Sequence, residues 1–300
     1  MTTPIEPPAP PAKPAPLRPG RKLGPIADGV GNIHRAWLEQ LRSTYLTSGL
    51  TLSDLSTRVP LAKSKLSELL RGTGLYPRWE IILSLALQLQ MPGWPLYRLW
   101  RQAAFEAQKS NDWIERCSDK ASVTTSQVPP LDHRAFREIV DNDYLFYAQV
   151  FLDDDQRDTA VSNTFDILWL RWNEALASPD IRRFAWNTLR TTVMARTPHI
   201  DGRPEFGEAA FDTVALRHLT TDTERLHQVE ESLQLFKAMS RLPDQQLDIM
   251  VLRLLYGICP ENASTLMGVP LATIRSGERH AAHFLESVIC PTPETEGNTA

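Results

Sequence analysis

The sequence predicts an all-α fold, on the basis of three observations. Apolar residues recur three or four positions apart along most of the chain, which is the spacing of residues on the buried face of a helix. Long segments in which apolar and polar residues alternate, as in half-buried strands, do not occur in the sequence. Glycine and proline interrupt the helical segments at short intervals, so the expected helices are short and pack in bundles.

Length and composition limit the class of protein. The 300 residues correspond to about two domains, or three small ones, at roughly 150 residues per domain. A hydrophobic content of 42% excludes wholesale disorder. No apolar run approaches the ~20 residues of a membrane-spanning helix, and three scattered cysteines fit neither a disulfide framework nor a Cys-x-x-Cys metal site. These features predict a cytoplasmic protein that has no membrane partner.

Charge is distributed unevenly along the chain. The formal net charge is −4, which by itself argues against a nucleic-acid partner. Residues 1–110, however, hold 14 basic and 7 acidic side chains, whereas residues 111–300 hold 18 and 29. Because a basic segment attracts polyanions, the two parts of the chain are expected to have different partners.

The first 110 residues divide into a tail and a bundle of five expected helices. Residues 1–25 hold nine of the 23 prolines and are predicted to be a disordered tail. Residues 30–110 form the bundle, which begins with a helix that has Trp37 and Leu41 on one apolar face. The second and third helices are short and meet near Pro60, an arrangement typical of a helix-turn-helix.

The third expected helix, residues 62–70, carries candidate DNA-binding residues. In a helix-turn-helix the second helix of the motif lies in the major groove, while the first crosses the phosphate backbone. Serine, lysine and arginine side chains can donate hydrogen bonds to phosphates and base edges. The candidates on this helix and just beyond its end are Lys63, Ser64, Lys65, Ser67 and Arg71. The alternative is a helical bundle with a basic surface that binds no DNA.

The segment from about residue 32 to residue 107 resembles the Xre/Cro-type helix-turn-helix family. The matching residues are Gly49–Ser56, Leu61–Ser67 and Arg71-Gly72. Ser56 and Pro60 stand where that family usually has alanine and glycine. The resemblance implies a DNA-binding domain whose partner is double-stranded DNA.

Residues 242–290 predict a helical unit that contains a second helix-turn-helix. A helix over residues 243–256 is expected to stop at Gly257, and Gly268 supplies a tight turn before the last helix. Pro270 lies at the start of that helix, where its missing N–H costs little. The candidate DNA-binding residues on the last helix are Thr273, Arg275, Ser276 and Arg279.

This unit resembles region 4 of bacterial sigma factors, the extracytoplasmic-function type in particular. The matching residues are Leu242-Pro243, Val251–Arg253, Gly257, Gly268–Pro270 and Thr273–Ser276. The departures are Gln246, Asn262–Ser264 and Gly277-Glu278. Because residues 241–300 carry four basic side chains against seven acidic ones, this unit is expected to bind DNA weakly or not at all.

The middle of the chain resembles sigma region 2. Residues 118–130 are expected to be a linker, residues 131–197 a helical domain, and residues 198–241 a linker with helices. The residues that match region 2 are Thr164, Phe165, Leu168 and Trp169, whereas the expected acidic and amide positions hold Thr159, Ser162 and Asn163. The resemblance implies that Phe165, Asp166 and Trp169 contact RNA polymerase, and packing in a core remains the alternative for the tryptophan.

The helix that follows would, by the same resemblance, melt promoter DNA. The candidates on and after this helix are Arg182, Arg183, Asn187, Arg190 and Arg196. Arginines that track phosphate are typical of single-strand channels. The alternative is a solvated helix face.

No catalytic residues, metal ligands or cofactor motif can be assigned from the sequence, so the chain is predicted not to be an enzyme and to use no cofactor. We expect a bacterial DNA-binding transcription regulator, cytoplasmic and nucleoid-associated, that directs RNA polymerase to promoters through its sigma-like module. The alternative is a degenerate sigma-like regulator that binds DNA by its N-terminal domain and a protein by the rest, without sigma activity. Besides DNA, the candidate partners are core RNA polymerase and an anti-sigma or other regulatory protein.

Overall fold

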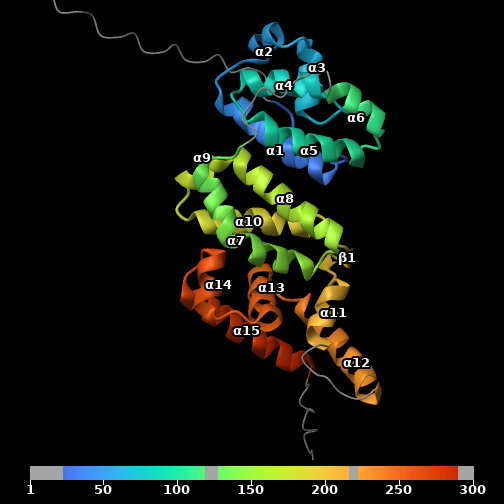
Figure 1. Cartoon of the computed structure of the whole chain (residues 1–300), viewed down its shortest axis with the longest axis vertical. Coiled ribbons are helices and arrows are strands. Elements are labelled where there is room, and N and C mark those ends of the chain that lie inside the picture. The colour runs from blue at the N-terminus through green and yellow to red at the C-terminus, as the bar shows by residue number, and fades with distance from the viewer. Residues whose placement is uncertain (1–22, 119–127, 216–221, 290–300) are drawn as a thin grey trace, which may run out of the picture.

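The computed structural model describes residues 23–118, 128–215 and 222–289. For residues 212–215 and 222–229 it describes the backbone alone. Nearly all of the predicted tail and most of the predicted linker over residues 118–130 lie outside these ranges. Within them, the chain forms fifteen α-helices, one π-helical segment and one two-stranded hairpin. The predicted all-α class is therefore confirmed. Figure 1 shows three layers stacked along the long axis of the molecule.

The N-terminal layer is a bundle of six helices around one core. They are α1 (Asn32–Thr47), α2 (Leu52–Arg58), α3 (Lys63–Leu70), α4 (Trp79–Gln88), α5 (Gly93–Glu106) and α6 (Asn111–Ser118). The prediction of five helices missed α6, whose Ile114 and Cys117 are buried in the same core. This helix has only two buried residues, so its sequence lacks the apolar stripe that identified the other helices.

Local interactions fix both ends of α2. Thr51 Oγ1 accepts a hydrogen bond from the Asp54 backbone N–H at 3.2 Å, and the Asp54 carboxylate accepts one from the Thr51 backbone N–H at 2.8 Å. This reciprocal capping box starts the helix at Leu52. The helix ends ahead of Pro60, which favours the extended backbone adopted by Val59. The short connection that results brings α2 and α3 side by side.

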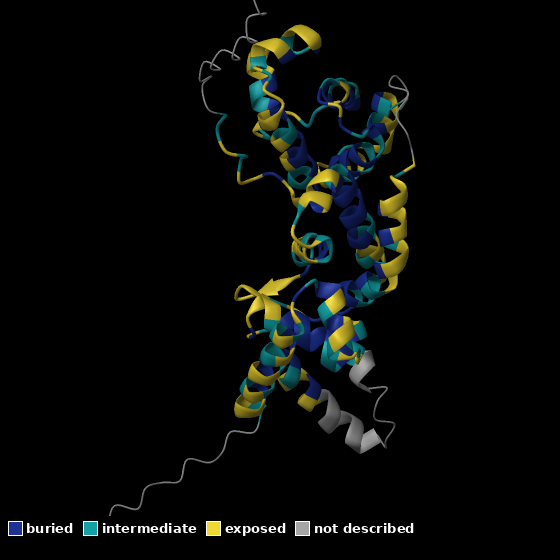
Figure 2. Cartoon of the chain, turned by 90° about the vertical axis from the view of Figure 1, so that its left-hand side faces the viewer, coloured by how far each residue is buried: buried dark blue, intermediate teal, exposed yellow. Residues whose placement is uncertain are grey.

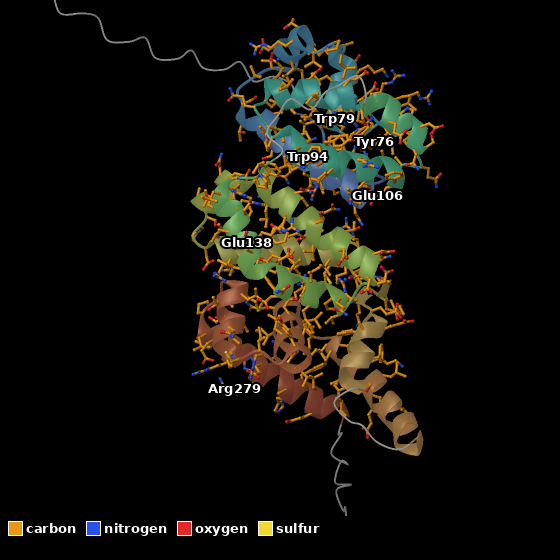
Figure 3. All side chains as sticks on the ribbon, in the orientation of Figure 1. Tyr76, Trp79, Trp94, Glu106, Glu138 and Arg279 are labelled. Carbon is orange, nitrogen blue, oxygen red and sulfur yellow. The ribbon has the colours of Figure 1, made fainter. Side chains whose placement is uncertain are left out.

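Aromatic side chains dominate the core of this bundle. Trp37, Trp79 and Trp100 are fully buried, and Figure 3 shows Trp79 and Tyr76 within the bundle. The Tyr76 hydroxyl donates to the Trp100 carbonyl at 2.7 Å, and the Trp100 indole N–H donates to the Pro77 carbonyl at 2.9 Å. These two bonds fasten the connection between α3 and α4 to α5.

The middle layer consists of α7 (Leu131–Gln149), α8 (Asp154–Leu170), α9 (Trp172–Ala177) and α10 (Ile181–Met194). Its central helix is α8, which packs against α7 and α10 on one side and against α1 and α5 on the other. Phe165 and Leu168 belong to the core of the middle layer, whereas Ile167 belongs to the N-terminal core. Because α8 is covered on two sides, its buried residues do not form a single stripe.

The C-terminal layer shares its core with the middle layer. It comprises β1 (His199–Ile200), β2 (Arg203–Pro204), α11 (Glu208–Ala215), α12 (Asp222–Met239), α13 (Asp244–Met250), the π-helical η1 (Val251–Tyr256), α14 (Pro260–Met267) and α15 (Leu271–Ile289). One continuous set of buried apolar side chains extends from Phe136 on α7 to Leu285 on α15. Residues 198–241, predicted to be a linker with helices, contribute Phe206 and Phe236 to this core.

The helix expected over residues 243–256 is divided into α13 and η1. The π-helical turn of η1 follows α13 directly, and Gly257 then ends it in the left-handed region, with φ at 80°. The predicted glycine stop is therefore confirmed, although the helix before it is not uniform.

In the part of the chain that the structure describes, none of the helices has both the length and the hydrophobicity needed to cross a membrane.

Figure 2 shows buried residues through the interior of the three layers and exposed residues on the outer helices. The N-terminal core and the shared core meet at α8. The position of the first bundle relative to the other two layers therefore depends mainly on the packing of this helix.

Candidate nucleic-acid interface

The candidate residues on α3 lie together on one open surface. The buried face of the helix is apolar and consists of Leu66, Leu69 and Leu70. On the other face Lys63, Ser64, Lys65 and, just beyond the helix, Arg71 are exposed, while Ser67 is half-buried. Figure 1 shows α2 and α3 at the end of the N-terminal bundle that lies away from α8. Neither of the other two layers covers this surface.

The cations of this surface are weakly compensated. The Lys65 ammonium lies 2.7 Å from the Glu68 carboxylate, in an exposed pair. Exposed pairs of this kind contribute roughly 0–1 kcal/mol, so a phosphate can replace the carboxylate at little cost. Lys63 and Arg71 form no ion pair with any other described residue. The first turn of α3 therefore offers positive charge that is free to meet a polyanion.

The C-terminal end of α3 is held rigidly on α1. The Arg42 guanidinium donates to the Leu70 carbonyl at 3.1 Å and to the Leu23 carbonyl at 3.2 Å. Gly72 has φ at 67° and packs so closely that a Cβ atom there would lie 2.5 Å from a methyl group of Val30. Neither Arg42 nor this close contact could be recognised in the sequence as part of the site. Both fix the orientation of α3, which favours a defined binding geometry.

The second predicted helix-turn-helix, formed by α14 and α15, is packed against the middle layer. Gly268 forms the turn between them, with φ at 63°. A Cβ atom on Gly268 would lie 2.3 Å from the Arg183 backbone nitrogen, so the turn presses against the start of α10. The Asp180 carboxylate caps that end of α10 by accepting from the backbone N–H groups of Arg182 and Arg183 at 2.8 and 3.1 Å.

The candidate residues on α15 carry little free positive charge. Arg275 is exposed but pairs with the Glu261 carboxylate at 3.0 Å. Arg279 is also exposed and forms no ion pair within the described ranges; Figure 3 labels it on the side of the molecule away from the N-terminal bundle. Thr273 and Ser276 are half-buried. This surface therefore offers weaker phosphate attraction than the α3 surface.

The three residues expected to contact polymerase lie inside the structure. The exposed fractions of Phe165, Asp166 and Trp169 are 2%, 4% and 9%. Asp166 pairs with the Arg98 guanidinium of α5 at 2.8 Å, and Arg98 also donates to the Ser162 hydroxyl at 2.6 Å. Burial raises the pKa of Asp166 to about 7, although Arg98 opposes the shift. In this arrangement these side chains join α8 to its neighbours and do not face solvent.

The five residues expected to melt promoter DNA do not form one cationic surface. Arg183 and Asn187 are exposed, and Arg182 is half-buried. Arg190 turns toward α13, where it pairs with the Asp248 and Asp244 carboxylates at 3.1 and 2.8 Å. The Arg196 guanidinium donates to the Thr192 carbonyl at 2.9 Å and lies near α1.

Asp248 is a buried acid that the sequence analysis missed. Its carboxylate accepts from the Tyr147 hydroxyl at 2.7 Å, the Trp186 indole N–H at 3.0 Å and the Arg190 guanidinium at 3.1 Å. These bonds connect α13 to α7 and α10, and burial raises the pKa of the carboxyl. The signal was present in the sequence, because Asp248 lies three residues before Val251, on the apolar face of the predicted helix.

Comparison with known protein families, with curated proteins and with solved structures found no match for this chain.

Proposed function

We propose that this chain is a bacterial transcription regulator that binds duplex DNA through the helix-turn-helix formed by α2 and α3. The observation that carries the proposal is the first turn of α3, where Lys63, Ser64 and Lys65 are all exposed to solvent. A recognition helix contacts base edges with residues of its N-terminal part, and basic side chains nearby position the duplex. The anchoring of α3 by Arg42 supports a fixed reading geometry.

The other two layers would act as a sigma-like module that has no sigma activity in this arrangement. The burial of Phe165, Asp166 and Trp169 favours this interpretation over the alternative that the chain itself acts as a sigma factor. In this arrangement α5 covers the part of α8 that carries Asp166, so polymerase could contact that residue only if α5 moved away. The module would instead bind a protein partner through a different surface.

Selection of duplexes from a randomised library by the full-length chain tests the DNA-binding proposal. We expect the wild-type chain to enrich one sequence, and a variant with Lys63→Ala, Lys65→Ala and Arg71→Ala to enrich none. The control variant carries Arg134→Ala, Arg203→Ala and Lys237→Ala, which remove the same charge from exposed positions outside the N-terminal bundle. Equal enrichment by all three chains, with unchanged circular dichroism, would refute the proposal.

Sigma activity is the second candidate function, and the specific observation in its favour is the match of Gly268–Pro270 and Thr273–Ser276 to region 4. Run-off transcription with purified core polymerase and the selected duplex separates the two. Initiation that depends on this chain supports a sigma factor. DNA binding without any association with core polymerase supports the regulator.

A further inference from the structure

A cavity of about 380 Å³ lies between the N-terminal bundle and the middle layer. Its walls come from α1, α8 and α10 and from the residues just after α8 and α10. The volume is within the range of roughly 300–1,000 Å³ that is typical of small-molecule sites, and such sites often occur between domains. None of the α3 residues proposed to bind duplex DNA lines this cavity, although Asn187 and Arg196, two of the candidates for promoter melting, do.

Positive charge predominates in the cavity wall. Three arginines line it, Arg35, Arg171 and Arg196, against a single lining acid, Glu39. Arg35 and Glu39 are 3.8 Å apart, at the outer limit of an ion pair, and Arg171 pairs with Glu174 outside the wall at 2.9 Å. An anion that entered the cavity would therefore meet more cationic than anionic side chains.

Arg196 is the least compensated of these arginines. Its guanidinium donates to the Thr192 backbone carbonyl, and no carboxylate of the described residues forms an ion pair with it. Burial lowers the pKa of its guanidinium, and the negative charge of Glu106 on α5 opposes this shift. A half-buried cation that forms no ion pair is partly desolvated without compensation, so a bound anion would stabilise it.

The wall also contains an unsatisfied polar group. Asn163 on α8 is only 2% exposed, and its amide nitrogen has no hydrogen-bond partner among the described residues. Buried amide groups are nearly always paired, so an unpaired donor in a cavity wall indicates a missing acceptor. The apolar part of the wall is provided by Ile33, Ile167 and Phe184.

We infer that this cavity binds a small organic anion, with a carboxylate or phosphate group at Arg196 and an apolar body against Ile167 and Phe184. The guanidinium presents paired N–H donors that match either group. The ligand also touches both layers, because Ile33 belongs to α1 and Asn163 to α8. It therefore binds only while α1 lies against α8 and α10. Because the ligand binds this arrangement and no other, binding stabilises the contact between the two layers. This inference does not depend on the proposed DNA-binding function.

Calorimetric titration of the full-length chain with two matched probe pairs tests this inference. Phenylacetate is compared with phenylacetamide, and adenosine monophosphate with adenosine. We expect at least one anion to bind with a Kd of about 1–10 mM, the range that the ligand efficiency of small fragments allows, and its neutral partner to bind at least about tenfold more weakly. Binding of phenylacetate alone assigns a carboxylate ligand, and binding of the nucleotide alone assigns a phosphate ligand.

Substitutions of the cavity arginines test whether the anion binds in this cavity. Arg196→Gln should weaken the binding of the anion at least about tenfold, because a charge-assisted hydrogen bond is lost. Arg134→Gln, on an exposed part of α7, should leave it unchanged. If Arg196→Gln does not fold, Arg171→Gln is the second variant, with a smaller loss expected. Failure of both anions to bind at about 20 mM, or equal binding to Arg134→Gln and both cavity variants, would overturn the inference.

Discussion

The α2–α3 pair and the α14–α15 pair are both pairs of helices joined by a tight connection, yet they are placed very differently. In the first pair the connection is at the surface, with Pro60 exposed, and the polar face of α3 is open. In the second pair the Gly268 turn presses against the backbone of α10. The comparison teaches that a helix-turn-helix pattern in a sequence does not establish an open reading surface, because packing around the turn decides it.

The two pairs of helices also differ in how many of their basic side chains form ion pairs. Around α3, Lys63 and Arg71 have no carboxylate partner among the described residues, and Lys65 has one exposed partner. Around α15, Arg279 has no ion-pair partner among the described residues, but Arg275 is paired with Glu261, and Glu278 is paired with Arg253. The α3 surface therefore has more free positive charge than the α15 surface. Three predictions test this contrast and a fourth tests the contact between α5 and α8, in order from the largest expected effect to the smallest.

The largest effect is expected where the C-terminal pair joins the body. Asp248→Ala removes the carboxylate that Tyr147, Trp186 and Arg190 share, leaves the two buried donors of Tyr147 and Trp186 unpaired, and leaves Arg190 only its exposed partner Asp244. The free energy of unfolding should fall by about 3–5 kcal/mol. Urea unfolding measures it, and Asp244→Ala, whose carboxylate is exposed, is the control with an expected loss under about 1 kcal/mol. Similar losses in both variants would contradict the assigned role of Asp248.

Gly49, in the connection between α1 and α2, provides a matched control for Gly268, in the turn between α14 and α15. Gly268 and Gly49 both have positive φ, but only Gly268 meets a neighbouring backbone atom at 2.3 Å. Gly49→Ala should cost about 1 kcal/mol for the left-handed backbone alone. Gly268→Ala should cost about 2–3 kcal/mol, since α14 must also move away from α10. Thermal unfolding of both variants measures the difference, and equal losses would show that the second turn is not held against α10.

DNA affinity should separate the two surfaces. The variant with Lys63→Ala, Lys65→Ala and Arg71→Ala should bind the selected duplex at least about 30-fold more weakly than wild type, with a shallower salt dependence. A variant with Arg275→Ala and Arg279→Ala should lose less than about threefold. Fluorescence anisotropy at several salt concentrations gives both values. The reverse ranking would move the DNA-binding surface to α15.

The contact between α5 and α8 should respond to pH through Asp166. Its pKa in the folded chain, about 7, is above the ordinary value of 3.8 because the carboxyl is buried. Its contribution to stability is therefore full below about pH 4 and is lost as the pH rises through 7. Relative to Asp166→Asn, the wild-type free energy of unfolding should fall by about 1–2 kcal/mol between pH 5 and pH 7. A difference that stays constant, or that grows with pH, would contradict this environment for Asp166.

The parts of this picture that could be predicted from the sequence are local. The spacing of Leu66, Leu69 and Leu70 determines which side of α3 is buried, so the exposure of Lys63 and Lys65 follows from the same periodicity. The glycine turns at Gly257 and Gly268 were likewise predictable, since the left-handed backbone there favours glycine.

The parts that could not be predicted depend on contacts between distant residues. Asp166 looked like a surface residue because its partner, Arg98, is 68 positions away and belongs to another layer. The cavity around Asn163 and Arg196 has the same origin, since α1, α8 and α10 meet only in the folded chain. Periodicity specifies that α8 is a helix, but it does not specify that two cores cover it.

Site-specific photo-cross-linking to the selected duplex tests the central claim most directly. Ser64 and Ala272 are each the second residue of their helix, α3 or α15, and both are exposed. A photoreactive phenylalanine derivative introduced at either position reports which helix touches DNA. We predict a DNA adduct from position 64 and none above background from position 272. An adduct from position 272, with none from position 64, would contradict the account.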